Sequence, residues 1–213
     1  MLASYPGVAD VLWTARENEE NAMKHFCDLT IACVLIVLTL PLMAIVALAI
    51  KLDSFGPVFY RQERVGLGGR CFTLLKFRSM ICDAEPDGRP VWATERDIRV
   101  TRVGRLIRRM RIDELPQLFN VLRGDMSMVG PRPERPYFVD QLTAIIPYFA
   151  ERHRIKPGIT GWAQINLPYG ASIPDAGKKL SYDLYYMRNR TTAFDLIILL
   201  STVRIVLFKI GAR

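Results

Sequence analysis

An unbroken run of 22 uncharged, mostly apolar residues, from Leu29 to Ile50, limits what this chain can fold into. About 20 such residues are enough for a helix to cross the hydrocarbon core of a bilayer. Pro41 lies just past the middle of the run, and an interior proline removes a hydrogen bond and kinks a helix. The pattern fits a kinked helix that spans the membrane. The alternative is a re-entrant helix that breaks at Pro41 and returns to the same face.

The charge balance of the chain indicates its kind of partner. The chain has 213 residues and a formal net charge of +8, although half of its residues are hydrophobic. A positive surface attracts polyanions, and together with a long apolar segment it suits an anionic membrane better than a nucleic acid. The sequence therefore predicts contact with anionic membrane lipids and no nucleic-acid partner.

Shorter patterns after the apolar run predict a mostly helical α+β domain. Aromatic and β-branched residues on both sides of Gly66–Gly69 predict a β-hairpin. Seven arginines and a single acid lie between Arg96 and Arg111, where phosphate or a lipid surface is the natural counter-charge. The apolar residues of that stretch recur at helical spacing: Val103, Leu106, Ile107 and Met110.

The next helix is predicted to begin at Pro116, because proline suits a first helical turn. Its buried side would hold Leu118, Val121 and Leu122. The stretch "KPGITGWAQIN" is rich in turn residues and predicts a loop. The C-terminal segment is strongly apolar but contains Asp195, Arg204 and Lys209, so a helix lying in the membrane interface is expected there instead of a second span.

The adjacent acids Asp113 and Glu114 have two interpretations. They could cap the helix that follows or complement its dipole, which is common for acids near helix starts. The alternative is chemistry on phosphate. The nearby Arg108, Arg109 and Arg111 would keep a carboxylate ionised. An ionised carboxylate can attack phosphorus, and adjacent carboxylates can hold Mg²⁺ together with a substrate phosphate.

Several long motifs resemble one protein family. "DELPQLFNVLRGDMSMVGPRP", the upstream "FTLLKFRSM" and the downstream "KPGITGWAQIN" and "YDLYYMRN" are similar to the bacterial sugar transferases, which are monotopic polyprenyl-phosphate phosphoglycosyltransferases. The resemblance runs from about residue 24 to the C-terminus. It implies transfer of a sugar 1-phosphate from a UDP-sugar to polyprenyl (undecaprenyl) phosphate, with release of UMP. That reaction would be the first membrane step in the synthesis of an exopolysaccharide or another glycoconjugate.

The resemblance also implies roles for individual residues. Asp113 would be the nucleophile that forms a covalent phosphosugar intermediate. Glu114 would hold Mg²⁺ or activate the lipid phosphate, and the sequence does not separate these roles; Asp113 and Glu114 are together the expected metal ligands. Arg108 and Arg132 match phosphate-binding arginines of the family. Lys76 and Arg78 are expected as additional phosphate contacts.

The implied architecture is a membrane-inserted re-entrant helix-break-helix with a small cytoplasmic domain that contains a β-hairpin and interfacial amphipathic helices. The expected divisions are a polar leader (1–24, helical from about Val8), a re-entrant helix (25–52), a catalytic domain (53–190) and an interfacial helix (191–213). The family breaks its first helix at Ser-Pro, whereas this chain has Leu40-Pro41. The implied location is the cytoplasmic face of the inner membrane of a bacterium.

Three further points remain as expectations. The C-terminal part looks most like exopolysaccharide-type members, which favours glucose or galactose over an N-acetylated sugar. A homodimer is left open. The rival interpretation is a membrane-anchored basic scaffold, or a module that binds nucleic acid or lipid, without catalysis. Against nucleic acid, the aromatic residues do not interleave with the arginines as a base-stacking platform requires.

Overall fold

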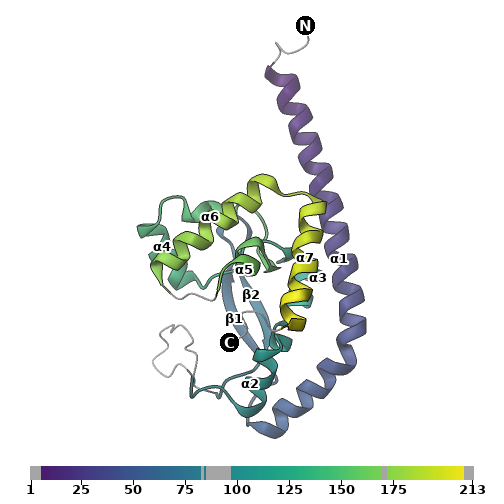
Figure 1. Ribbon diagram of the computed structural model, residues 1–213, viewed down its shortest axis with the longest axis vertical. Coiled ribbons are helices and arrows are strands. Elements are labelled where there is room, and N and C mark those ends of the chain that lie inside the picture. Colours follow the sequence, from purple (N-terminus) through teal and green to yellow (C-terminus); the bar gives the residue numbers. More distant parts are fainter. Residues whose placement is uncertain (1–5, 83, 85–96, 169–171, 209–213) are drawn as a thin grey trace.

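A computed structural model describes residues 6–82, 84, 97–168 and 172–208 of the chain (Figure 1). It is a mostly helical α+β structure with a long apolar helix and small sheets, as the sequence predicts. Its helices are α1 (Pro6–Asp53), α2 (Arg102–Arg109), α3 (Gln117–Arg123), α4 (Pro136–Ile145), α5 (Trp162–Asn166), α6 (Ile173–Asn189) and α7 (Thr192–Phe208). Its strands are β1 (Phe59–Val65), β2 (Cys71–Phe77), β3 (Ser127–Val129) and β4 (Gly158–Thr160), and its 3₁₀ turns are η1 (Leu67–Gly69), η2 (Ile112–Glu114) and η3 (Phe149–Arg154).

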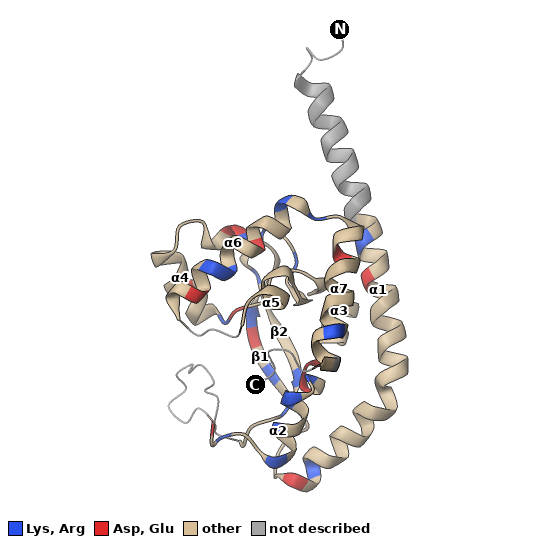
Figure 2. Cartoon of the chain, in the orientation of Figure 1, with Lys and Arg blue, Asp and Glu red and all other residues tan. Residues whose placement is uncertain are grey.

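Helix α1 runs along one side of the molecule, and its long middle part is free of charge (Figures 1 and 2). One face packs on the folded body through Ala32, Met43, Val46 and Ile50. The opposite face is also apolar and exposed: Val34, Val37, Leu38, Ile45 and Leu48. Exposed apolar stretches of this size mark contact with another apolar phase. Among the described residues, only α1 is long and apolar enough to cross a membrane, which is consistent with membrane association.

Pro41 does not interrupt α1, which is helical through this position. The helix bends in its second half, the half that contains Pro41, in the lower part of Figure 1. The Thr39 hydroxyl donates to the Leu35 carbonyl at 2.7 Å. The helix also continues through the expected boundary between residues 24 and 25, and α6 and α7 meet near residue 190.

The N-terminal end of the apolar segment is hydrogen-bonded to the folded body. Lys24 Nζ lies 2.5 Å from Asp195 Oδ2 in α7 and donates to the Val129 carbonyl at 3.2 Å. One helical turn later, Asp28 Oδ1 accepts a hydrogen bond from the Met128 backbone N–H at 3.2 Å. Helix α1 is therefore tied to β3 and α7 where its apolar stretch begins. Asp195 is buried in this contact, so it does not face lipid as a charge of an interfacial helix would.

The C-terminal end of α1 is held by the same body. The last carbonyls of a helix have no partner within the helix and are often bound by a basic side chain. Here Arg78 supplies it: Nη2 donates to the Ile50 carbonyl in the last turn at 3.4 Å. The same guanidinium also binds the chain just past the helix, where Nη2 donates to the Ser54 carbonyl at 2.7 Å and Nη1 to the Phe55 carbonyl at 2.5 Å. Asp53 Oδ2 accepts from the Val103 backbone N–H at 3.0 Å. Both ends of the apolar helix thus contact one folded unit.

The predicted hairpin is confirmed. Strands β1 and β2 pair antiparallel from Phe59 opposite Phe77 to Val65 opposite Cys71, and η1 turns the chain through Gly68 and Gly69, both with positive φ. The second sheet was not predicted. Strands β3 and β4 pair in parallel, so part of the expected loop "KPGITGWAQIN" is a strand and the short helix α5.

Two of the helical predictions are confirmed only in part. In α2, Ile107 is buried and Val103 packs beside it, whereas Leu106 and Met110 are exposed. In α3, Leu118 and Val121 belong to the core, but Leu122 is exposed. Helix α7 presents six exposed large apolar residues: Leu196, Ile197, Leu200, Val203, Val206 and Phe208. Its predicted interfacial charge Arg204 is exposed, and Lys209 lies outside the described residues.

Candidate active site

Asp113 and Glu114 lie in the turn η2 between α2 and α3. Arg111, just before this turn, has a φ of 55°, which ends α2 and redirects the chain. Both acidic side chains are buried, each about 9% exposed. Helix α3 begins after Pro116 without a side-chain capping bond. The capping interpretation therefore has no support here.

Glu114 is held by two cations from separate elements. Its Oε1 accepts from Lys76 Nζ of β2 at 2.8 Å and from Arg132 Nη2 at 2.6 Å. Burial by itself would raise the pKa of Glu114, but Arg132 and Lys76 outweigh it and hold the pKa well below its usual value. Glu114 is therefore ionised, and both bonds use one oxygen.

The Asp113 carboxylate has no hydrogen bond or ion pair with any described residue. Burial raises the pKa of Asp113 to about 6, and the neighbouring charge of Glu114 adds to the rise, while Lys76, Arg108 and Arg132 oppose it. At neutral pH the carboxylate is mostly ionised and unpaired. A buried, unpaired carboxylate surrounded by cations is chemically suited to attack an electrophile that carries negative charge.

The predicted phosphate contacts fall into two groups. Lys76 and Arg132 touch Glu114, and Arg108 in α2 is close enough to lower the pKa of Asp113. These cations meet the acidic pair. Arg78 does not join them, because its guanidinium binds carbonyls in the last turn of α1 and just past it. Its position supports a structural role in place of the predicted phosphate contact.

A buried amide holds the site together. Asn120 in α3 is fully buried; its Oδ1 accepts from the Leu75 backbone N–H at 3.0 Å, and its Nδ2 donates to the Thr73 carbonyl at 2.7 Å. The side chain thus pairs with β2 as the backbone of a neighbouring strand would. This contact fixes α3, and with it Asp113 and Glu114, next to Lys76 on the same strand.

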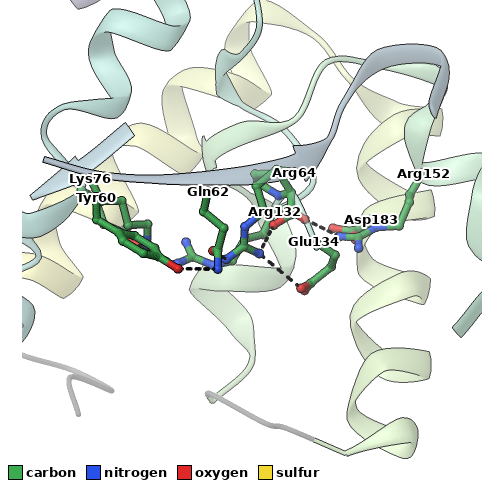
Figure 3. A network of polar contacts seen from close by, with 10 residues as sticks. Tyr60, Gln62, Arg64, Lys76, Arg132, Glu134, Arg152 and Asp183 are labelled. Atoms are coloured by element: carbon green, nitrogen blue, oxygen red, sulfur yellow. Dashed lines mark hydrogen bonds and ion pairs between the residues drawn. The ribbon is translucent and has the colours of Figure 1, made fainter. Parts of the chain in front are cut away.

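Sequence reasoning missed three polar residues around Arg132, all seen in Figure 3. Arg64 donates to the Pro133 carbonyl at 2.9 Å, and Arg152 donates to the Arg132 carbonyl at 2.9 Å. Arg152 is in turn paired with Asp183 at 2.8 Å. The spacing of Tyr60, Gln62 and Arg64, every second residue along β1, was the one available signal that a polar face turns toward the site.

A magnesium site was expected at the acidic pair. The described residues contain no cluster of three His, Cys, Asp or Glu side chains that could hold a metal. Mg²⁺, however, is often bound by one or two carboxylates, with substrate phosphate and water completing its shell. Asp113 is unpaired, and both cations on Glu114 use Oε1. The carboxylate oxygens present therefore fit a cation that arrives with a phosphate ligand.

Comparison with known proteins gives a consistent result. The sequence profile described as "Bacterial sugar transferase" matches residues 19–209. The chain is 48% identical over 191 residues to UDP-N-acetylgalactosamine-undecaprenyl-phosphate N-acetylgalactosaminephosphotransferase of Aeromonas hydrophila, covering 90% of this chain and 45% of the relative. It is 43% identical over 192 residues to UDP-glucose:undecaprenyl-phosphate glucose-1-phosphate transferase of Escherichia coli (strain K12), covering 89% and 41%.

A third relative is similar in length. It is an uncharacterized sugar transferase of Bacillus subtilis (strain 168), 43% identical over 191 residues, with 90% of both chains covered. By contrast, this chain spans less than half the length of the Aeromonas and Escherichia proteins.

Proposed function

This chain belongs to the bacterial sugar transferase family, and on that premise we propose that it transfers a sugar 1-phosphate from a UDP-sugar to polyprenyl (undecaprenyl) phosphate. UMP is released, and the product is a polyprenyl-diphosphate sugar that starts a polysaccharide. The relatives from Aeromonas and Escherichia carry names for this type of reaction. The observation that carries the proposal is the unpaired Asp113 carboxylate beside Glu114, which two cations already neutralise.

The proposed mechanism has two displacements at one phosphorus atom. A carboxylate oxygen of Asp113 attacks the phosphorus that bears the sugar, the bond from this phosphorus to the bridging oxygen breaks, and UMP leaves. A phosphate oxygen of the polyprenyl acceptor then attacks the same phosphorus, and the bond to Asp113 breaks. Arg132, Arg108 and Lys76 stabilise the negative charge of the phosphates during both steps.

Magnesium is a proposed cofactor at the same carboxylates. Asp113 and Glu114 would hold it, and when bound it would neutralise phosphate charge and help to orient the diphosphate of the donor. Glu114 remains ionised in the folded protein because Arg132 and Lys76 stabilise its charge, so it can take part as a ligand without first losing a proton.

The identity of the nucleotide product tests the proposal. Purified protein, UDP-sugar, polyprenyl phosphate and Mg²⁺ should yield UMP in every turnover. Without the acceptor, one equivalent of UMP per protein should appear, and Asp113 should carry the mass of the phosphosugar. Release of UDP would indicate an ordinary glycosyltransferase, and absence of any nucleotide product would favour a non-catalytic scaffold.

A matched variant tests the nucleophile. Asp113→Asn should abolish turnover while the protein still folds and binds membranes, because an amide of nearly the same shape does not attack phosphorus. Retention of more than about a tenth of wild-type activity, a loss of only about 1.4 kcal/mol in the barrier, would remove Asp113 from this role. Asp140→Asn, an exposed carboxylate on α4, is the control for the change in charge.

The assay of UMP release also tests which UDP-sugar is the donor. Relatives are named for glucose and for N-acetylgalactosamine, and we propose a hexose donor from the character of the C-terminal part. UDP-glucose and UDP-galactose should be turned over faster than UDP-N-acetylgalactosamine. The reverse order would assign this chain to the N-acetylated donors.

We also propose that α1 is re-entrant in the inner membrane of a bacterium, with the site on the cytoplasmic face. Lys24 and Asp28 at one end of the apolar segment, and Asp53 at the other, are hydrogen-bonded to one folded body. A spanning helix would have to separate these ends by a bilayer. The exposed apolar faces of α1 and α7 would meet lipid, and the excess positive charge would meet anionic headgroups.

Cysteine labelling tests this topology. In a cysteine-free background, a single cysteine at Glu19 should react only from the cytoplasmic side, as should the control Lys178→Cys on the exposed surface of α6. Labelling of the Glu19 position by an impermeant reagent from outside intact cells would establish a spanning helix. The assignment of the site would survive that result.

A further inference from the structure

Arg132 lies in the loop 130–135, which has few backbone N–H donors to fix its conformation. Its neighbours Pro131 and Pro133 have no backbone N–H, so most of the bonds that fix the loop must be accepted by its carbonyls. The Pro131 carbonyl accepts from the Gly158 N–H at 2.9 Å, and the Glu134 carbonyl accepts from the Val65 N–H at 3.0 Å. The two carbonyls between them, those of Arg132 and Pro133, accept from no backbone N–H in the described part of the chain.

Two arginine side chains supply the missing donors. Arg64 Nη1 donates to the Pro133 carbonyl at 2.9 Å, and Arg152 Nη2 donates to the Arg132 carbonyl at 2.9 Å. These bonds come from opposite sides, from β1 and from η3 (Figure 3). The backbone of the residue that binds Glu114 is therefore fixed by a side chain that touches neither acidic residue.

Arg152 is itself held in an almost fully buried ion pair. Its Nε and Nη2 both donate to Asp183 Oδ2 of α6, at 3.1 and 2.8 Å, and its guanidinium carbon lies 5.1 Å from the centre of the Phe149 ring. The exposed fractions are 5% for Arg152 and 2% for Asp183. A buried pair adds little net stability compared with well-packed apolar residues, so stability alone does not account for it.

We propose that the Arg152–Asp183 ion pair positions the Arg132 side chain beside Asp113 and Glu114. Asp183 fixes the plane of the Arg152 guanidinium, Arg152 fixes the Arg132 carbonyl, and the Arg132 side chain then reaches Glu114 Oε1 at 2.6 Å. Neither Arg152 nor Asp183 is a catalytic residue, because each acts only through Arg132. The role rests on the proposed function, in which Arg132 binds phosphate.

Asp183→Asn and Arg152→Lys test this inference. Both weaken the bidentate contact while keeping similar shapes. UMP release should slow by about tenfold or more, a change of about 1.4 kcal/mol in the barrier. In an Arg132→Lys background the same changes should add less than about a twofold loss, because residues that act through one another are not additive. Equal losses in both backgrounds would overturn the proposal.

Hydrogen exchange gives a second readout that needs no substrate. The backbone amides of the four non-proline residues of this loop (Gly130, Arg132, Glu134 and Arg135) should exchange faster in Asp183→Asn than in the wild type, since the loop loses a fixed carbonyl. The control is Ile198→Ala in α7, a buried apolar residue outside this network. It should lower the melting temperature without changing exchange in the loop or the rate per folded molecule.

The outcomes separate the two proposals. Unchanged exchange at 130–135 in both Asp183→Asn and Arg152→Lys would show that the pair is only structural. If the wild type released no UMP, the proposed function would fall, and the exchange data would still decide whether the pair orders the loop. If Asp183→Asn did not fold, Arg152→Lys would carry the same comparison.

Discussion

The two adjacent carboxylates should have opposite effects on stability. Asp113 has a pKa of about 6 in the folded protein, whereas an unfolded chain gives an aspartate about 3.9. A carboxyl with a raised pKa is penalised only when it ionises, so its cost to folding is absent below pH ~4, grows between about pH 4 and 6, and is complete above that range. The full cost is about 3 kcal/mol.

Asp113→Asn removes this cost, so the variant should be more stable than the wild type at pH 7.5. For a chain of this size the gain corresponds to a rise in melting temperature of about 6–12 °C. At pH 5 the gain should fall to about half, because part of the wild-type Asp113 is then protonated. The measurement is thermal unfolding in detergent with EDTA, since a bound divalent cation would itself lower the pKa of Asp113.

Glu114→Gln should do the reverse. It leaves Lys76 and Arg132 as partly buried cations without their carboxylate, which should lower the melting temperature. The reasoning is refuted if Asp113→Asn melts at or below the wild-type temperature at pH 7.5. It is also refuted if the advantage of Asp113→Asn does not shrink on acidification. Asp140→Asn serves as the control for the change in net charge.

Further predictions follow from the same contacts. The kcat/KM for the UDP-sugar, followed by UMP release, should fall by about tenfold per pH unit below about pH 6, as Asp113 becomes protonated. Lys76→Met should raise the pH below which kcat/KM falls, because Lys76 lowers the pKa of Asp113. Asn120→Ala should destabilise the protein by about 2–4 kcal/mol in thermal unfolding, because it leaves two backbone groups of β2 without partners; the exposed Asn166→Ala should not. Arg78→Met should lower the melting temperature but leave the KM of the folded enzyme unchanged; a large rise in KM would restore Arg78 as a substrate contact.

Local signals in the sequence were enough for the elements that depend on them. The glycines at 66–69 allow the positive φ values of the turn, so the hairpin could be read directly. Pro116 marks the start of α3 because its ring suits a first helical turn. In both cases the residue type determines the backbone within a few positions, and no distant contact is needed.

Periodicity could not tell one apolar environment from another. The stripe in α2 is real, but Ile107 packs into the core while Leu106 and Met110 are exposed. A helical repeat of apolar residues reports that these side chains avoid water. It does not report whether a protein core or another apolar phase covers them. The exposed Leu122 of α3 illustrates the same limit.

Contacts between segments that are distant in the sequence could not be predicted from its motifs. Lys76 and Arg78 are two residues apart and looked equivalent, yet one binds Glu114 and the other binds carbonyls at the end of α1. Both lie at the C-terminal end of β2, Lys76 within the strand and Arg78 just after it, and the difference is set by which segment packs against each position. Arg152 and Asp183 were missed for the same reason, because their relation to Arg132 exists only after η3 and α6 meet.

The charge balance of the site explains why several basic side chains surround Asp113 and Glu114. Asp113 and Glu114 carry two negative charges when ionised, and Lys76 and Arg132 balance them within contact or electrostatic reach. The ligand-free site is therefore close to neutral, although the chain is strongly basic. A nucleotide-sugar diphosphate brings further negative charge into a largely buried space, where uncompensated charge is costly. Arg108 lies close enough to act on Asp113 and supplies part of the compensation. A divalent cation on the free carboxylate oxygens would supply the rest, so the proposed dependence on magnesium follows from the charge balance of the site as well as from its ligands.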